Sequence, residues 1–406
     1  MSVKKDTIPL ASGVEVKRGE GFLNDNILVI GATGSGKTTS ITYPRIMSTY
    51  ESSLIIPIVK DGAYFEYKKM LENRGYTVHH LSFKSPKEST IGYDPLLGKT
   101  KEEDIVSLAE AIVRGRKGGM MGDYDPYWEN AAISAIGALM MLSTYLSKNN
   151  GSFGMFLNLF KRLRVNTGSI FSTNLDDIFD EMEENCPEAS APGMWKTFVT
   201  NAPKTASCIY SIMSSSVDKL GINGGFDELC KKKPFDIRTV GKKKTALFIS
   251  TSSSVSSKIA SGIFYGDAIK SLMDEAEKQG GTLPVPVQIL ADDFACGSTI
   301  NDFDRSISLF RQAGISATII LQSLSQLESI YGRASAQTIR DNCDTIVFFG
   351  STDIETCKVI STYLDIPLQD VFKMPPEKCA VIRRGSDPVI KDRCPMAMMQ
   401  CYENEI

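Results

Sequence analysis

The chain has 406 residues, 42% of them hydrophobic and 23% charged, a composition typical of a globular protein with a substantial core. The formal net charge of −3 excludes a general attraction to nucleic acid, so any DNA contact must be local, as in the lining of a channel. Nine cysteines without a C-x-x-C pair, and histidine only at His79 and His80, argue against a disulfide framework, a zinc site and histidine-based catalysis.

Residues 1–26 are polar apart from one apolar patch, which predicts an irregular lead-in or an edge hairpin. The apolar run 27–30 then predicts a buried strand, and residues 31–38 follow it with the pattern G-x-x-x-x-G-K-[ST]. Glycines at 31, 34 and 36 let backbone N–H groups surround phosphate oxygens without a clash from Cβ. A helix that begins near residue 39 places its N-terminal dipole against the anion. This stretch predicts a nucleotide-binding loop rather than a chance glycine-rich turn.

The residue types in this loop suggest a role for each position. We expect the nucleotide to be bound by Thr33, Gly34, Ser35, Gly36, Lys37, Thr38 and Thr39. Lys37 is expected to reach the β- and γ-phosphates, and the Thr38 hydroxyl to bind Mg²⁺. Until phosphate arrives, we expect the Lys37 side chain to be exposed.

Strands and helices alternate after the loop. Residues 53–59 read as a strand, 63–73 as a helix and 76–83 as a third strand. This rhythm predicts an α/β fold with a mostly parallel sheet and crossover helices.

The rhythm changes near residue 101. Residues 101–235 are rich in helical periods and poor in strand patterns, which predicts a mostly helical insertion; further crossover helices are the less favoured alternative. Strand patterns return at 245–250, 285–291, 315–321 and 345–349, and a hairpin is predicted within 379–392. We therefore predict three segments. Residues 1–100 and 236–406 form a nucleotide-binding domain, and residues 101–235 form a helical domain inserted into it.

The apolar run 287–291 ends in two carboxylates, Asp292 and Asp293. In a phosphate-loop enzyme the first such acid holds the Mg²⁺ shell, and a following carboxylate polarises the attacking water. Any buried strand can end in acids, so the pair alone says little. Because it follows the Lys37 loop in the expected chain order, it predicts catalytic carboxylates.

Two further polar residues fit a nucleotide site. Arg311 precedes a turn at Gly314 and could reach across a subunit boundary as an arginine finger, or could be a surface arginine favoured by a helix C-terminus. Gln322 follows the strand 315–321 and could sense the γ-phosphate, although a polar residue in that position is usually part of a loop. The residues alone leave both pairs of alternatives open.

Several motifs recur in a characteristic order along the chain. They are residues 31–38, 127–132 (Tyr-Trp-Glu-Asn-Ala-Ala), 290–294, 311–314 (Arg-Gln-Ala-Gly), Gln322-Ser323, Gln326-Leu327, Tyr331-Gly332 and Asn342-Cys343. Together they resemble the coupling-protein ATPases of type IV secretion and conjugation systems. The resemblance covers residues 24–365 and is most specific between 290 and 350.

The resemblance implies a RecA-like P-loop core with an inserted all-alpha domain, ATP and Mg²⁺ as cofactors, and a homo-hexamer around a channel, with a monomer in isolation left open. It implies that the ring recruits a DNA–relaxase substrate and drives its transfer into the secretion channel. On the matching positions, Asp292 becomes the Mg²⁺ aspartate, Arg311 the finger acting in trans and Gln322 the sensor.

The sequence departs from the family pattern in three places, one of them at residues 58–62, where only part of the family motif Asp-Pro-Lys-Gly-Glu is present. Coupling proteins usually begin with a membrane-spanning segment, whereas no apolar run of membrane length and no signal peptide is found here. We therefore expect a cytoplasmic protein held at the inner face of the membrane by partners, or a trimmed chain. The family generally has Glu after the metal aspartate, where this chain has Asp293, whose carboxylate is set back by roughly 1.5 Å.

Two other functions compete with this interpretation. A DNA translocase of the chromosome-segregation type shares the RecA-like core, although the helical insertion with Trp128-Glu129 favours the coupling protein. A weakly hydrolysing ATP-binding adaptor that docks substrates is the second alternative, and Asp293 keeps it open.

Overall fold

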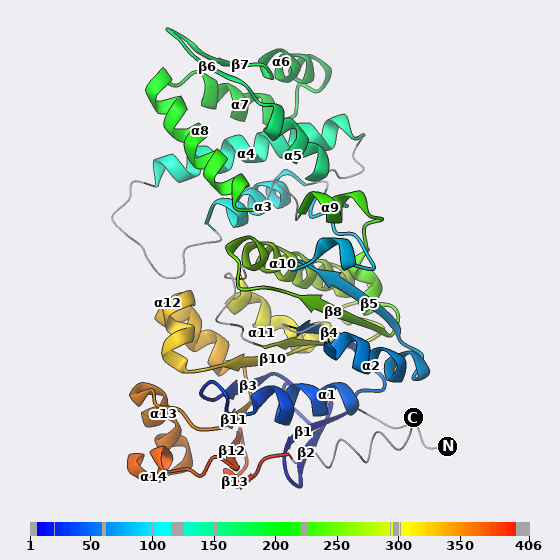
Figure 1. The fold of residues 1–406 in the computed structure, drawn as a ribbon, viewed down its shortest axis with the longest axis vertical. Coiled ribbons are helices and arrows are strands. Elements are labelled where there is room, and N and C mark those ends of the chain that lie inside the picture. The colour runs from blue at the N-terminus through cyan, green and yellow to red at the C-terminus, as the bar shows by residue number, and fades with distance from the viewer. Residues whose placement is uncertain are drawn as a thin grey trace. The chain divides into compact units, whose positions relative to one another are not determined.

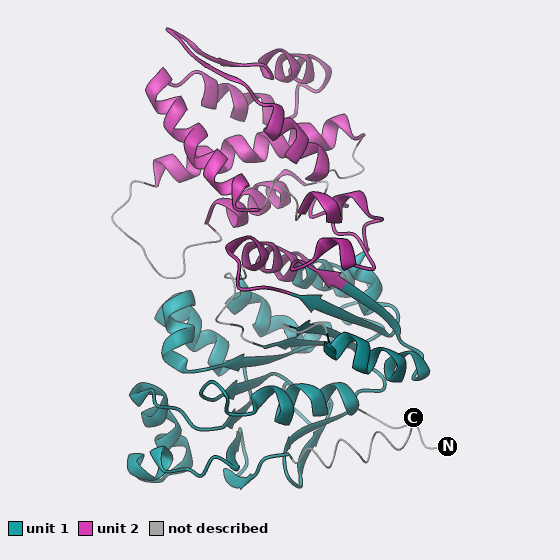
Figure 2. Ribbon diagram, in the orientation of Figure 1, with its two compact units in different colours: residues 1–80, 236–250, 268–406 teal, residues 81–235, 251–267 magenta. Residues whose placement is uncertain are grey.

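The computed structural model describes residues 6–19, 21–58, 62–99, 101–114, 126–148, 153–220, 226–292, 294, 300 and 302–394. The chain divides into two compact units (Figure 2). The sheet unit comprises residues 1–80, 236–250 and 268–406, and the helical unit comprises residues 81–235 and 251–267. The sheet unit is thus assembled from three separate stretches of the chain.

The main sheet contains nine strands within the described residues (Figure 1). In spatial order they are β13 (Val389–Asp392), β12 (Lys378–Arg383), β11 (Thr345–Phe348), β3 (Ile27–Ile30), β10 (Ile315–Leu321), β9 (Val287–Ala291), β4 (Ser53–Ile58), β8 (Thr245–Ser250) and β5 (Thr77–Ser82). The neighbours from β11 through to β8 pair in parallel, and β12 pairs antiparallel with β11 and β13. The predicted α/β fold with a mostly parallel sheet is confirmed.

The first three strands of this sheet in sequence order, β3, β4 and β5, are not neighbours in it. Between β3 and β4 lie β10 and β9, and between β4 and β5 lies β8. The intervening strands come from beyond the helical insertion, so the two halves of the chain interleave. Because β3, β10 and β9 are parallel, their carboxyl ends meet at one edge of the sheet.

Helices and a hairpin surround the main sheet. Their bounds are β1 (Thr7–Ala11), β2 (Val14–Lys17), the π-helical turn η1 (Thr38–Thr42), α1 (Tyr43–Met47), α2 (Gly62–Asn73), the 3₁₀ turn η3 (Ile237–Gly241), α11 (Phe303–Ala313), α12 (Leu324–Asp341), α13 (Ile354–Leu364) and α14 (Leu368–Phe372). Helix α10 (Val255–Lys278) begins in the helical unit and ends in the sheet unit. Local chemistry sets several of the helix ends. The Ser323 and Asp353 side chains cap α12 and α13 by accepting backbone N–H bonds, and α11 ends at Gly314 with φ of +76°.

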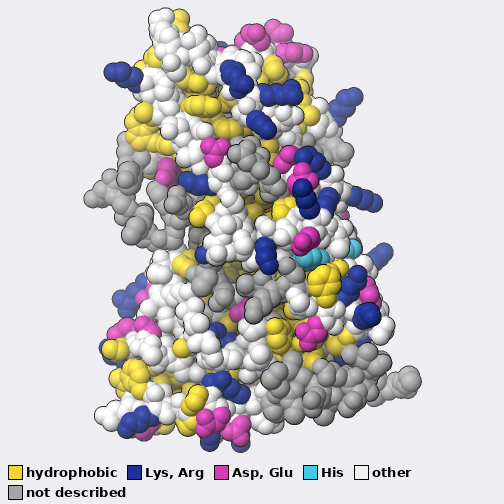
Figure 3. Space-filling view, in the orientation of Figure 1, with side chains coloured by type: hydrophobic (Ala, Val, Ile, Leu, Met, Phe, Trp, Pro, Cys, Tyr) yellow, Lys and Arg dark blue, Asp and Glu magenta, His cyan; other side chains and the backbone are white. Residues whose placement is uncertain are grey.

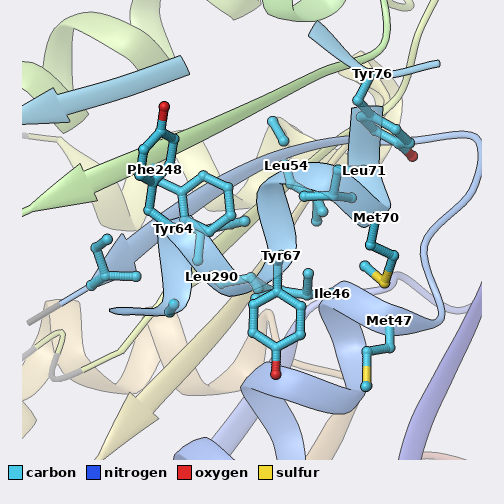
Figure 4. Close-up of a cluster of buried hydrophobic side chains, with 14 residues drawn as sticks. Ile46, Met47, Leu54, Tyr64, Tyr67, Met70, Leu71, Tyr76, Phe248 and Leu290 are labelled. Atoms are coloured by element: carbon cyan, nitrogen blue, oxygen red, sulfur yellow. The ribbon is translucent and has the colours of Figure 1, made fainter. Parts of the chain in front are cut away.

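Two clusters of buried apolar side chains pack against the main sheet. One joins α1 and α2 to β4, β8 and β9, with Tyr64, Leu71 and Leu290 among its members (Figure 4). The other packs the β1–β2 hairpin against β3, β10, β11 and β12. Burying a large apolar side chain contributes about 1.5–3 kcal/mol, so these clusters hold the strand and helix that flank residues 31–38 in place.

The helical unit is organised around α4 (Tyr127–Leu146), which contacts four other helices of the unit. Its elements are the 3₁₀ turn η2 (Pro86–Glu88), α3 (Glu102–Arg114), α5 (Phe153–Arg162), α6 (Asp176–Asn185), α7 (Ala191–Val199), α8 (Pro203–Asp218) and α9 (Phe226–Lys231), with the hairpin β6 (Val165–Thr167) and β7 (Phe171–Thr173). The prediction of this region contained no strand. Segments of three residues are too short to show a two-residue period, which explains the missed hairpin. No helix in the described part of the chain is both long and apolar enough to cross a bilayer.

Candidate nucleotide-binding site

The glycine-rich loop follows the central strand β3, whose four residues are all buried. Its first two backbone N–H groups are used by neighbouring strand ends. Gly31 N–H donates to Leu321 O over 3.1 Å, and Ala32 N–H donates to Gly350 O over 3.0 Å. The loop is therefore hydrogen-bonded to the last residue of β10 and to the segment that follows β11, at the edge where parallel strands end.

Glycine is required at three positions of this loop for two different reasons. Gly34 and Gly36 have φ of +75° and +77°, a left-handed conformation that strains other residues. Gly31 is required for a different reason, because neighbouring side chains occupy the space that a Cβ would need. A Cβ there would lie 2.6 Å from Ser35 Oγ and 2.8 Å from Phe349 Cβ. The motif glycines thus allow a loop shape that side chains would prevent.

The chain leaves the loop through the turn η1 and then α1. The first bonds of this helical segment run from Ser40 N–H to Gly36 O, over 2.9 Å, and from the Thr39 hydroxyl to the same oxygen, over 3.0 Å. Pro44 stands in the first turn of α1, where its missing N–H is tolerated. The helix after the loop is therefore present where the sequence predicted one.

Lys37 folds back onto its own loop. Its side chain is only 8% exposed, and Nζ donates to Gly31 O over 2.6 Å and to Ala32 O over 2.9 Å. The expectation of an exposed lysine is therefore wrong. The physical reason is that two carbonyl oxygens of the loop accept hydrogen bonds from the ammonium group. These bonds replace the water that the ammonium group gives up on burial, and they satisfy the two oxygens.

Thr38 and Asp292 meet at the end of the loop. The Thr38 hydroxyl donates to Asp292 Oδ2 over 2.8 Å. Asp292 stands directly after β9, as the sequence predicted, and the register of β9 and β10 sets it at the loop edge of the sheet. Asp293, the second predicted carboxylate, lies outside the described residues.

The residues around the loop fit a nucleotide and a magnesium ion. Ser35 Oγ is buried and has no hydrogen-bond partner within the described residues, so its hydrogen-bonding capacity is left for a ligand. The positive φ angles of Gly34 and Gly36 shape a concave loop of the kind that binds anions. The described residues contain no group of three or more His, Cys, Asp or Glu side chains that could hold a metal ion. One hydroxyl and one carboxylate suit Mg²⁺, which keeps water and phosphate oxygens as its other ligands.

Gln322 lies beside the loop. It directly follows Leu321, whose carbonyl oxygen accepts the Gly31 N–H, and its own N–H donates to Gln326 Oε1 over 3.1 Å. The end of β10 therefore brings Gln322 to the edge that carries Thr38 and Asp292.

Arg311 lies at the opposite edge of the sheet. It is an exposed residue in the last turn of α11, just before β10 begins. In the parallel pair of β10 and β3, Leu321 stands beside Ile30, so the start of β10 is remote from the loop. A strand of this length spans roughly 20 Å, which is beyond the reach of an arginine side chain. Arg311 is thus not part of the site formed by its own chain.

Two residues beside the loop were missed by the sequence analysis. Phe349 stands directly after β11, and its Cβ lies 2.8 Å from the position that a Cβ on Gly31 would occupy. Arg393, directly after β13, brings Nη1 to within 3.0 Å of the position that a Cβ on Gly36 would occupy. Neither belongs to a local motif, and only the pairing of β11, β12 and β13 brings them here.

Comparison with known proteins identifies the family of this chain. The sequence profile of the family described as "Type IV secretory system Conjugative DNA transfer" matches residues 2–364. The chain belongs to this family. The resemblance to conjugative coupling proteins is therefore confirmed, and the matched region contains the loop, Asp292, Arg311 and Gln322.

One curated relative in this conjugative DNA transfer family is the conjugal transfer protein TraG of Rhizobium radiobacter. It is 23% identical over 349 residues, which are 84% of this chain and 52% of the relative. The chain therefore spans about half the length of the curated relative that it matches.

Solved structures share the fold. The unbound form of the bacterial conjugative coupling protein TrwB has a TM-score of 0.69 at 16% identity, and the match covers 97% of this chain and 88% of the TrwB chain. TrwB with ADP and Mg²⁺ has a TM-score of 0.67 at 16% identity, covering 97% of this chain and 90% of its own. VirB4 of Thermoanaerobacter pseudethanolicus has a TM-score of 0.58 at 12% identity, and the match covers 97% of this chain and 98% of the VirB4 chain. The expected P-loop NTPase fold is confirmed by this similarity.

Proposed function

We propose that this chain is the ATP-hydrolysing motor of a conjugative coupling protein. The observation that carries the proposal is the hydrogen bond from Thr38 to Asp292, which joins the glycine-rich loop to the acid after β9. A phosphate-loop NTPase needs this pair to hold Mg²⁺ beside the β- and γ-phosphates. Structures of TrwB with ADP and Mg²⁺ and with a non-hydrolysable ATP analogue support ATP and Mg²⁺ as the cofactors.

Each residue of the site has a role in this proposal. Residues 33–39 surround the phosphates, and Lys37 exchanges the Gly31 and Ala32 carbonyls for phosphate oxygens when nucleotide binds. Bound Mg²⁺ would neutralise charge on the phosphate oxygens from a position held by Thr38 and Asp292. Asp293 orients the attacking water, and Gln322 senses the γ-phosphate from the end of β10.

Arg311 completes the site from a neighbouring subunit. Because it lies at the far edge of its own sheet, it can contact a transferring phosphate only in another copy of the chain. This position supports a ring, and we propose a homo-hexamer as the active form, with the isolated chain free to be monomeric. A head-to-tail ring places the loop edge of one subunit against the Arg311 edge of the next.

The cargo in this proposal is DNA bound to a relaxase. On the face shown in Figure 3, the Lys and Arg side chains of the described residues are scattered among Asp and Glu and form no single basic surface. With a net charge of −3, this favours DNA contact in a ring channel over contact with a broad outer surface. We propose the relaxosome and the type IV secretion channel as partners, with a membrane partner that holds this cytoplasmic motor at the inner face of the membrane.

The first test is nucleotide binding by the Lys37→Ala variant. Removing the ammonium should abolish detectable hydrolysis and weaken ATP binding on the order of 10-fold or more, since hydrogen bonds to charged groups are strong. Lys358→Ala is the matched control, because its side chain is 56% exposed on α13 and pairs only with Glu355 in the described structure. A Lys37→Ala protein that binds and hydrolyses ATP like the parent would overturn the proposal.

A weakly hydrolysing adaptor is the second candidate function. The observation that favours it is Asp293, whose shortened carboxylate stands where the family generally has Glu. Misplacement of a catalytic group by about 1 Å can cost about 10²-fold in rate. Steady-state ATP turnover with and without DNA separates the two functions. Turnover stimulated by DNA supports the motor, whereas tight ATP binding with negligible turnover under both conditions supports the adaptor.

A further inference from the structure

The C-terminal hairpin brings a cation to the phosphate loop. In the pairing of β12 with β13, Lys378 stands beside Asp392, and β12 in turn pairs with β11, the neighbour of β3. Arg393 directly follows Asp392 and therefore emerges at the edge of the sheet where the loop lies. Its Nη1 atom is 3.0 Å from the position that a Cβ on Gly36 would occupy. The glycine at 36 leaves room for this guanidinium.

Arg393 is held in place from two sides. Its guanidinium carbon lies 5.3 Å from the centroid of the Phe349 ring, a cation–π contact. Its backbone N–H donates to Glu377 O over 2.9 Å, which fixes the end of β13. The side chain is thus positioned before any ligand arrives, so little conformational entropy is lost on binding.

The guanidinium also has an unused donor. Arg393 Nε is buried and has no hydrogen-bond partner within the described residues. A buried donor without an acceptor is unfavourable, so its position beside the loop points to a ligand that supplies acceptor oxygens. A planar guanidinium matches phosphate oxygens in geometry as well as in charge.

We propose that Arg393 binds the α- and β-phosphates of the nucleotide in the site of its own subunit. This inference rests on the proposed function, because it needs a nucleotide in the loop. The backbone of a phosphate loop surrounds the α- and β-phosphates, and Gly36 belongs to that backbone. Arg393 therefore contributes to the binding of ADP and ATP alike, in contrast to Arg311, which acts on hydrolysis in a neighbouring subunit.

The test measures the affinity of Arg393→Ala for ADP and for a non-hydrolysable ATP analogue, both with Mg²⁺. Both affinities should fall about 10-fold or more, by nearly equal factors, because the lost contacts are to phosphates that the two ligands share. The Arg393→Lys variant keeps the charge without the fork of donors, so its affinities for the two ligands should lie between those of the parent and of Arg393→Ala. Lys391→Ala is the matched control, since it removes an exposed cation from the same strand, β13.

The outcomes separate this inference from the proposed function. Parent-like binding by Arg393→Ala, with binding lost in Lys37→Ala, overturns the role of Arg393 and leaves the nucleotide site intact. Loss of affinity for the ATP analogue alone also overturns it, because the contact would then be to the γ-phosphate. A parent protein that binds neither ligand removes both proposals. If Arg393→Ala does not fold, Arg393→Gln keeps much of the side-chain length without the charge and is judged by the same outcomes.

Discussion

The hydroxyl of Thr38 donates a hydrogen bond to Oδ2 of Asp292 over 2.8 Å, although 254 positions separate the two residues in the chain. Thr38 stands after β3 and Asp292 after β9, and β10 lies between these strands and pairs with both. The two oxygens belong to the donor class that Mg²⁺ prefers. The proposed metal position therefore depends on the register of strands that come from two distant parts of the sequence.

Asp292→Asn should remove the magnesium dependence of nucleotide binding. The amide keeps the shape and can still accept the Thr38 hydrogen bond, but it lacks the charge that attracts Mg²⁺. Nucleotide affinity, measured by calorimetry with Mg²⁺ and with a chelator, should become the same under the two conditions. Asp274→Asn, an exposed acid on α10, serves as the control. An unchanged gain in affinity from Mg²⁺ in the Asp292→Asn protein would refute the assignment.

Arg311→Ala should lose ATP hydrolysis and keep ATP affinity within a few fold. An arginine finger stabilises charge on the transferring phosphoryl group and is worth about 10³ to 10⁵ in rate. Arg305→Ala is the matched control, because Arg305 lies on the same helix with its side chain 84% exposed. Purified monomer of the parent should bind ATP and hydrolyse it slowly, with turnover per subunit that rises with protein concentration.

Mixing variants tests whether Arg311 acts in trans. A ring of Arg311→Ala and Lys37→Ala subunits contains some interfaces where an intact loop faces an intact arginine. The mixture should therefore recover part of the ATP turnover that each variant lacks alone. The measurement is steady-state hydrolysis at a concentration where the parent assembles. Absence of recovery in rings shown to be mixed would mean that Arg311 has no role across the interface.

Asp293→Glu should raise ATP turnover. If the short acid is a poorly placed version of the family's glutamate, the longer side chain brings the carboxylate closer to the attacking water. The gain should be seen in turnover rather than in ATP affinity. Asp302→Glu is a control in the same segment of the chain. A fall in turnover would show that the site has been rebuilt around the aspartate.

Asp6→Ala should destabilise the sheet unit by about 3 kcal/mol. Asp6 is 3% exposed, and its carboxylate accepts the backbone N–H groups of Tyr50, Glu51 and Ser52 over 2.6–3.0 Å. Its removal leaves three donors unsatisfied between α1 and β4. Urea denaturation should show a lower midpoint than for Glu15→Ala, an exposed acid on β2. A midpoint equal to that control would mean that water replaces the carboxylate without cost.

Much of the site could be predicted from local sequence. The strand before residue 31, the glycines of the loop and the acid at 292 are recognised from short patterns, because backbone conformation and strand burial depend on residues close in the chain. The same holds for Gln322, whose place at the end of β10 follows from the apolar run before it. The ordered motifs also placed the chain in its family, which the match over residues 2–364 confirms.

Other features were decided by the tertiary structure. Lys37 is buried because two carbonyl oxygens of the folded loop are within its reach, which no spacing of residue types predicts. The parallel pairing of β3 with β10 sets Arg311 at the edge opposite the loop, out of reach of the site in its own chain. The hairpin after β11 carries Arg393 to Gly36 across more than three hundred positions of sequence. Local patterns determined which elements form, and hydrogen-bonded register between distant strands determined which side chains meet, because pairing joins residues without regard to their separation in the chain.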